Sequence, residues 1–237
     1  MSTASRRTIN YLGRDVSGSV PDASAVPGMM ELTRRDAVIW GRAKTFLQTR
    51  DNDAHSLYAY AIAKALLDRI PGADENIVLP AILLHDIGWS TVDERDALEA
   101  ISPGHDGRLK HLIIQHEVEG ARIAREILSE ANIPEADIDE ITDIINGHDT
   151  RSEALSLNDA LVKDADKVWR VTPHARRVVM DWFGLDANQS LRLCGYRAYD
   201  ELFTEEAKTM SRVLVTLGCI DLSDELAATY TREDGGF

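Results

Sequence analysis

Residues 81–88 read Ala-Ile-Leu-Leu-His-Asp-Ile-Gly, so an imidazole and a carboxylate directly follow four apolar residues. The surrounding segment, about residues 77–87, is apolar nearly all round, which predicts a buried central helix with Pro80 in its first turn. Burying His85 and Asp86 costs free energy unless the two side chains are paired or bind a cation. The stretch therefore predicts a polar site, hydrogen-bonded or metal-bound, at the end of a core helix.

Helical periodicity continues on both sides of this stretch. A weak capping box at Thr33, with Asp36 three residues later, begins a first helix, and a second helix starts near Asp53 and ends before Pro71. Residues 89–112 show no sustained period and predict a long loop or lid. Further helices are predicted at about residues 113–131, 135–147, 153–169 and 187–217, with turns at Pro134, Gly147 and Pro173. No segment alternates convincingly as a strand does, so the predicted fold class is all-α.

The two ends of the chain differ in composition from its centre. Residues 15–28 are rich in Ser, Gly, Pro and Asp, and we expect residues 1–32 to form an irregular N-terminal arm. Residues 33–221 are expected to form one helical domain, which is large enough to bury a core without disulfides. Residues 222–237 are expected to be a short acidic tail that frays.

The charge and cysteine content narrow the class of protein. The formal net charge of −14 comes from 40 acidic against 26 basic residues, which argues against a broad nucleic-acid-binding face but leaves room for a local basic pocket. Cys194 and Cys219 show no C-x-x-C spacing, so we expect both to be reduced. Apolar runs are far shorter than the roughly 20 residues of a membrane span, and the N-terminus lacks a secretory signal. We expect a cytoplasmic protein without a membrane segment, as a monomer or a homo-oligomer.

Six residues of metal-ligating type are spread over separate predicted helices or helix ends. Imidazole and carboxylate suit iron, manganese, zinc or nickel, and a thiolate-free set argues against a structural zinc site. The sequence therefore predicts a catalytic metal site. The six residues are His55, His85, Asp86, His116, His148 and Asp166.

Their order resembles the H…HD…D signature of the HD superfamily of metal-dependent phosphohydrolases. The resemblance covers about residues 50–170 and rests on His55, on His85-Asp86, and on Asp166 before Lys167-Val168. It implies a helical bundle around a central metal site, with extra helices at the N- and C-terminal ends. His116 and His148 resemble the two further histidines of the subset that binds two metals.

The resemblance also implies roles for these residues. Asp86 would bridge two divalent metal ions, with iron and manganese favoured over zinc, nickel, cobalt and magnesium. The family's last aspartate usually precedes a basic and an aliphatic residue, which selects Asp166 over Asp164. One metal would take His55, His85 and Asp166, and the other His116 and His148.

The expected reaction is hydrolysis of a phosphate ester or anhydride by a metal-activated hydroxide. The layout resembles most the symmetrical dinucleoside-tetraphosphate hydrolases, so the expected substrate is a small phosphorylated molecule such as a nucleotide. Asp86 is the central catalytic residue, and we expect Lys167 and Arg151, which flank ligands, to neutralise charge on the phosphoryl oxygens. Four further residues are candidates to meet the substrate or support the site: Asp164, Arg108, Lys110 and His111.

Two other functions remain open at this point. Mixed-valent di-iron oxygenases of the inositol and phosphonate type use a similar ligand set to activate dioxygen. A degenerate HD domain would instead act as a ligand sensor or a partner-binding module without catalysis.

Overall fold

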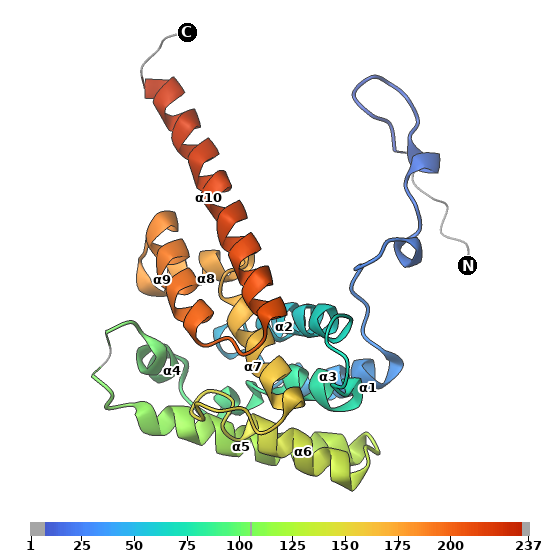
Figure 1. Cartoon of the computed structure of the whole chain (residues 1–237), viewed down its shortest axis with the longest axis vertical. Coiled ribbons are helices and arrows are strands. Elements are labelled where there is room, and N and C mark those ends of the chain that lie inside the picture. The colour runs from blue at the N-terminus through green and yellow to red at the C-terminus, as the bar shows by residue number, and fades with distance from the viewer. Residues whose placement is uncertain (1–7, 105, 234–237) are drawn as a thin grey trace. The chain divides into compact units, whose positions relative to one another are not determined.

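The computed structural model describes residues 8–104 and 106–233, with side chains up to residue 223. The chain divides into two compact units, Met1–Leu32 and Thr33–Phe237. Among the described residues there are helices and no strands, so the all-α prediction is confirmed (Figure 1). Residues 1–7 and 234–237, parts of the expected arm and tail, lie outside the described residues.

In the first unit, residues 8–32 form no α-helix and bury no residue. Their regular structure consists of two short 3₁₀ turns, η1 (Ser17–Ser19) and η2 (Ala23–Ala25), and one isolated antiparallel bridge between Ile9 and Asp15.

The second unit contains the α-helices. Two 3₁₀ turns flank the segment that carries His55, His85 and Asp86: η3 (Thr49–Asp51) and η4 (Ile87–Thr91). The helices are α1 (Arg34–Ala43), α2 (Asn52–Leu67), α3 (Glu75–Leu84), α4 (Glu94–Ile101), α5 (Lys110–Glu130), α6 (Glu135–Ile145), α7 (Leu157–Trp169), α8 (Pro173–Phe183), α9 (Ala187–Asp200) and α10 (Glu205–Glu233).

Short polar side chains begin several of these helices. The Thr33 hydroxyl accepts a hydrogen bond from the Asp36 backbone N–H, as the capping box predicts, and so begins α1. Asp186 and Gln189 form a reciprocal capping box at the start of α9. These caps satisfy N–H groups that have no partner inside a helix.

Three predicted boundaries are wrong. Helix α3 begins at Glu75, which puts Pro80 inside the helix rather than in its first turn. The predicted loop 89–112 contains α4, whose Ala97 and Ala100 pack inward, and α5 begins at Lys110. The stretch from residue 222, expected to fray, continues α10 to Glu233.

The predicted helix 187–217 is also wrong, because it is two helices, and α8 was not predicted. The chain bends between α9 and α10 at Phe203 and Thr204, whose backbone N–H groups bond to the carboxylate of Asp164 on α7. This contact joins residues about 40 positions apart. No local pattern reveals it.

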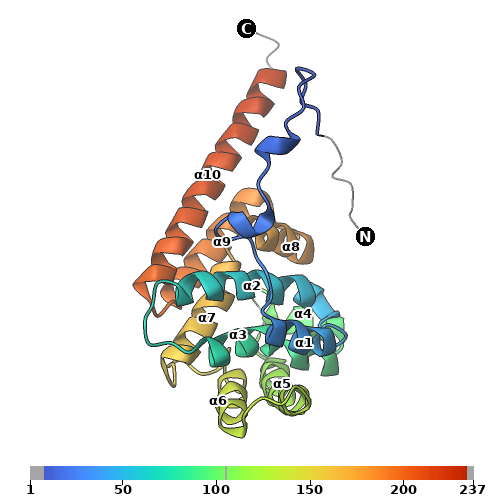
Figure 2. The same ribbon diagram turned by 90° about the vertical axis from the view of Figure 1, so that its right-hand side faces the viewer.

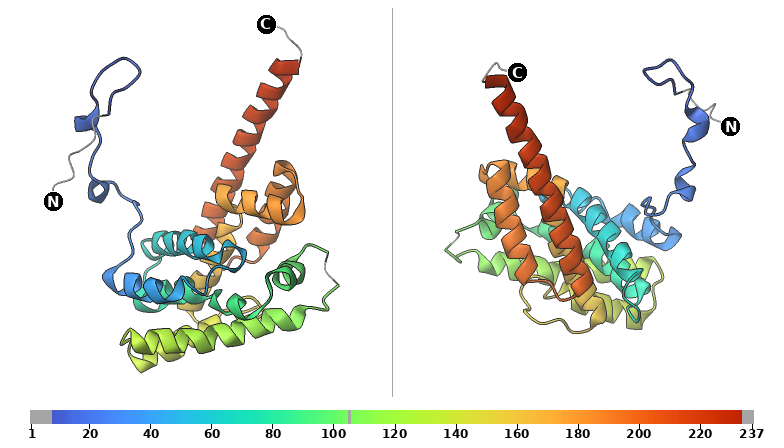
Figure 3. Two further views of the ribbon diagram at one scale, coloured as in Figure 1. Left: turned by 180° about the vertical axis from the view of Figure 1, so that it is seen from behind. Right: turned by 45° about the horizontal axis from the view of Figure 1, so that its top comes forward.

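Helix α3 is the centre of the second unit. Its residues from Ile77 to Leu84 are all buried, and it packs against α1, α2, α6 and α7. Figure 2 shows α3 with α2 on one side and α6 on the other. Further out, α9 and α10 run side by side (Figure 3). The apolar run in the sequence therefore forms the predicted core helix, and its C-terminal end delivers His85 and Asp86 into the interior.

The turn after α3 touches the backbone of α5. A Cβ atom added to Gly88 would lie 1.9 Å from the His116 carbonyl oxygen and 2.5 Å from the Gly120 nitrogen. On the other side, Gly120 faces the Gly88 nitrogen, 3.4 Å from where its own Cβ would be. Since any side chain at Gly88 would push the two backbones apart, this glycine sets how closely Asp86 approaches His116.

We expect Gly88→Ala to lower the free energy of unfolding by about 3 kcal/mol, because the added methyl group meets backbone rather than a flexible side chain. Urea denaturation measures the change. Gly41→Ala, in α1 with nothing within 4 Å of its added Cβ, is the matched control and should be neutral or stabilising by up to about 1 kcal/mol. Equal stability of the two variants would contradict the close contact.

Candidate metal centre

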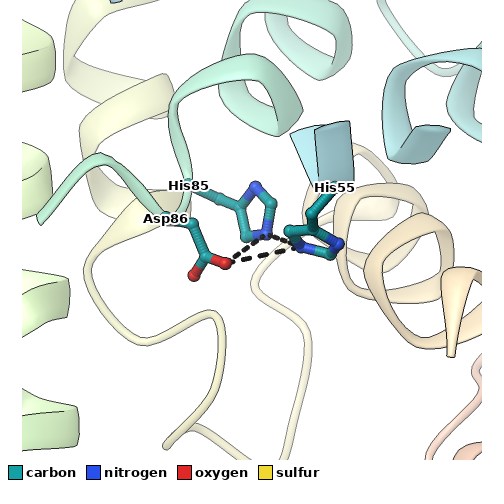
Figure 4. A group of neighbouring side chains, drawn as sticks. All are labelled: His55, His85 and Asp86. Atoms are coloured by element: carbon teal, nitrogen blue, oxygen red, sulfur yellow. Dashed lines mark hydrogen bonds and ion pairs between the residues drawn. The ribbon is translucent and has the colours of Figure 1, made fainter. Parts of the chain in front are cut away.

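The first cluster of ligand-type side chains joins α2, the end of α3 and α7. His55 Nε2 lies 2.9 Å from His85 Nε2 and 3.4 Å from Asp86 Oδ2 (Figure 4). Asp166 adds its Oδ1 atom, 3.3 Å from His55 Nε2. Four donor atoms from segments far apart in the sequence therefore surround one point in the interior.

The second cluster joins α5 and the loop after α6. His116 Nε2 and His148 Nε2 lie 3.4 Å apart, and each is within 3.8 Å of Asp86 Oδ1. Asp149 Oδ2 lies 3.7 Å from His116 Nε2 and 3.8 Å from His148 Nε2. Each cluster contains three buried groups with donor atoms that lie close enough to hold a metal ion.

Asp86 is the residue that the two clusters share. Its Oδ2 faces His55 and His85, whereas its Oδ1 faces His116 and His148. Trp89 fixes this arrangement from the side, because its Nε1–H donates to Asp86 Oδ1 at 3.1 Å and its ring stacks on that of His116 at 4.0 Å. A carboxylate held in this way is suited to bridge two cations.

Backbone contacts orient two of the imidazoles. His85 Nδ1 lies 2.8 Å from the Ile82 carbonyl oxygen, and His148 Nδ1 lies 2.8 Å from that of Ile145. Because a carbonyl oxygen only accepts, Nδ1 of each ring carries a proton and donates it. The Nε2 atom of each ring then faces its cluster, as metal-ligating histidines require.

Burial and the neighbouring carboxylates together set the charge of three of the imidazoles. Burial lowers the pKa of His85 to about 4 and that of His116 to about 3, so both rings are neutral near pH 7 and keep a lone pair for a cation. Burial opposes protonation of His148 as well, but the charges of Asp149 and Asp86 outweigh it and raise the pKa of His148 to about 9. In the metal-free protein this proton balances the carboxylates, and a bound cation would replace it.

The carboxylates are ionised despite their burial. Burial acts to raise the pKa of Asp86, but the facing histidines, His85 first, hold it well below its usual range. Lys167 has the same effect on Asp149 and on the buried Asp166, whose pKa values are also lowered. Its Nζ lies 2.9 Å from both Asp149 Oδ1 and Asp166 Oδ2. Lys167 thus links one carboxylate of each cluster.

The loop that carries His148 and Asp149 is held from both sides. The carboxylate of Glu117, on α5, accepts hydrogen bonds from the backbone N–H groups of Asp149 and Thr150, both at 2.8 Å. On α7, Lys163 Nζ donates to the carbonyl oxygens of residues 147, 148 and 151. Two buried charged side chains therefore replace the regular backbone hydrogen bonds that this loop lacks.

Two sequence-based candidates lie outside the centre. The guanidinium of Arg151 donates to the carbonyl oxygens of Asp143 and Asn146 at the end of α6 and pairs with Asp159, so it closes a helix end and faces no ligand. Asp164 accepts its hydrogen bonds from Phe203 and Thr204, as described above. These contacts place Arg151 at the end of α6 and Asp164 against the start of α10, and they favour Asp166 over Asp164 as the ligand. The catalytic role of Arg151 and the substrate contact of Asp164 stay predictions.

A cavity of about 490 Å³ opens onto the two clusters, and its lining separates the other candidates. Lys110 lines it, together with Lys167. Arg108 is exposed and pairs with Asp106 and Glu99, and His111 is exposed beside the Arg108 carbonyl oxygen. Of the predicted substrate-binding residues, the structure therefore places only Lys110 beside the centre.

Sequence reasoning missed several residues of the site. Asp149 could have been found, because it directly follows His148, as Asp86 follows His85. Glu117 and Lys163 act on backbone groups of a distant loop, which no spacing reveals. Arg50 and Trp89 line the cavity, and Arg50 sits in a polar run that carries no motif.

Comparison with known families assigns the chain. The model of the HD domain family matches residues 52–170, which is half of the chain and spans both clusters. The chain belongs to the HD domain family. No curated protein and no solved structure gives a significant match. None of its described helices is long and apolar enough to cross a membrane.

The donor set of this HD domain fits divalent metal ions. The four imidazole Nε2 atoms converge in two pairs at 2.9 and 3.4 Å, an arrangement of lone pairs that needs a proton or a cation between them. Mixed nitrogen and oxygen donors without thiolates suit iron, manganese, zinc or nickel. The residues present therefore fit two cations that share Asp86.

We expect Asp166→Asn and Asp164→Asn to behave differently, although the two positions are two residues apart on α7. Asp166→Asn should weaken metal binding by at least about a hundredfold, because a ligand is lost. Asp164→Asn should keep metal binding and lower the free energy of unfolding by about 1–3 kcal/mol, because it disturbs the hydrogen bonds that start α10. Titration of the metal-free protein and urea denaturation measure both effects. Loss of metal from the Asp164 variant alone would reverse the assignment.

Proposed function

We propose that this HD domain protein is a metal-dependent phosphohydrolase that acts on a small phosphorylated substrate such as a nucleotide. The observation that carries the proposal is the pair of donor clusters that share Asp86 and face one cavity. Family membership supports a metal-dependent hydrolase in general. The phosphate class is supported by the charges around the cavity.

The lining of the cavity is more basic than the chain as a whole. Five basic and four acidic side chains line it, whereas the whole chain carries a net charge of −14. Three of the four acidic groups are in the metal clusters, where cations would neutralise them. The basic residues are Arg50, Lys110, Lys167, Arg170 and Arg197. With divalent cations in place the cavity is strongly positive and suits a phosphorylated substrate.

Metal ions bound here would supply Lewis acidity and lower the pKa of a water molecule to give hydroxide near neutral pH. The protein's own residues prepare this chemistry. Asp86 holds the two clusters in a fixed relation, and the backbone bonds of His85 and His148 orient their Nε2 atoms. Lys167 and Arg170 lie next to Asp149 and Asp166 on the cavity wall, where they would neutralise charge that grows on phosphoryl oxygens.

We expect Asp86→Ala to lower kcat by about a thousandfold or more and to reduce bound metal, because both clusters lose a donor. The measurement is a panel of phosphomonoesters, phosphodiesters and nucleotide anhydrides, with metal analysis of each preparation. Asp139→Ala is the control, because Asp139 is exposed and pairs with Arg125 on the surface. Full activity of the Asp86 variant would refute the hydrolase proposal.

The same preparations test the two alternatives. Dioxygen uptake by the iron-loaded protein with a polyol or a hydroxyphosphonate, without phosphate release, would replace the hydrolase by a di-iron oxygenase. A metal-loaded protein without turnover but with ligand-induced thermal stabilisation would point to a sensor, since a ligand that binds only the folded state stabilises it.

A further inference from the structure

Arg50 occupies an unusual position just before α2. Arg50 and Asp51 both have left-handed backbones, with φ of 59° and 55°. Neither is glycine, so each costs free energy that other contacts must offset. The backbone N–H of Arg50 donates to Glu94 Oε1 on α4 at 3.1 Å, which helps to hold the turn. The turn directs the Arg50 side chain into the cavity above the metal clusters.

The guanidinium of Arg50 lies between two tryptophans. Its Cζ atom is 4.7 Å from the ring centroid of Trp89 and 5.2 Å from that of Trp182 on α8. The rings favour a cation between them. These contacts leave the N–H groups of the guanidinium for hydrogen bonds.

These N–H groups are left without partners by the protein. Nε and Nη1 of Arg50 are buried and make no hydrogen bond. Buried donors are nearly always satisfied, and a charged one is the most costly to leave unpaired. A planar guanidinium presents its N–H groups along its edges, where they bind the oxygens of a phosphate or carboxylate group.

The charges around Arg50 change sign when metals bind. In the metal-free protein the carboxylates whose charges attract the Arg50 guanidinium are those of Asp86, Asp149 and Asp166, all in the two clusters. Divalent cations held by the same carboxylates would oppose the charge of Arg50. A stable metal-loaded site would therefore need an anion between the cations and the guanidinium.

We propose that Arg50 is the anion-binding residue of this site and that its guanidinium N–H groups hold the oxygens of the substrate's phosphoryl group. The inference rests on the proposed function for the choice of a phosphoryl group. Trp89 and Trp182 hold the guanidinium in place. Trp89 also donates a hydrogen bond to Asp86 and stacks on His116. One side chain therefore positions Arg50 relative to both clusters of donor side chains.

The test measures binding of inorganic phosphate to the metal-loaded full chain by isothermal titration calorimetry. Arg50→Met keeps an unbranched apolar stem between the tryptophans but removes the charge and the donors, and it should weaken phosphate binding at least about tenfold. Arg50→Lys keeps the charge but loses the planar set of donors, so its phosphate affinity should lie between those of the wild type and Arg50→Met. Metal content should equal that of the wild type in both variants, because Arg50 is no ligand.

Arg122→Met is the matched control. Arg122 lies on the exposed face of α5, where it pairs with Glu119 and Glu126, and its loss should leave phosphate binding unchanged. If Arg50→Met does not fold, Arg50→Lys decides, and phosphate affinity equal to that of the wild type overturns the proposal. The proposal is also overturned if Arg50→Met folds and binds phosphate within a factor of two of the wild type. An Arg50 that only balances carboxylates would give that result together with lower stability of the metal-free variant.

The outcome is separate from that of the proposed function. If the protein binds phosphate through Arg50 but hydrolyses no phosphate compound, the anion site stands and the hydrolase proposal fails. If the protein is a hydrolase whose phosphate affinity does not depend on Arg50, the hydrolase proposal stands and the anion site fails. Metal-loaded wild type that binds no phosphate overturns the inference.

Discussion

The contact between the turn after α3 and the backbone of α5 is the constraint on which the centre depends. Gly88 lets the two backbones touch, and this brings Asp86 within 3.8 Å of the imidazole of His116. A wider separation would leave Asp86 with its first cluster alone. Because the two clusters share one carboxylate, a short distance between two backbones decides whether the interior holds one cation site or two.

The ligand-type residues could be predicted because their chemistry is visible in the sequence. His85 and Asp86 follow an apolar run that must be buried, and a buried polar pair needs a hydrogen-bond partner or a cation. The supporting residues could not be predicted, because the groups they satisfy are backbone atoms of other segments. Lys163 and Glu117 look like ordinary charged positions of amphipathic helices until the loop at residues 147–151 is in place.

Sequence reasoning missed the position of the Arg151 side chain and the break between the C-terminal helices for a related reason. Arg151 follows His148 closely in the chain, but its side chain turns back to the carbonyl groups that every helix leaves unpaired at its C-terminal end. Nearness in sequence says nothing about such a direction. The break between α9 and α10 likewise depends on a carboxylate of α7, so the periodic pattern alone continues through it.

The hydrogen bonds that anchor the His148 loop would affect how fast bound metal ions exchange. Each of the six predicted ligands is less than a tenth exposed, and the loop that carries His148 is anchored to both α5 and α7. None of these side chains can swing outward without breaking several buried hydrogen bonds, so a bound ion would leave through the cavity or only after part of the domain unfolds. A substrate would occupy the same opening and block it. Chelators would therefore remove metal from the substrate-free protein faster than from the protein during turnover.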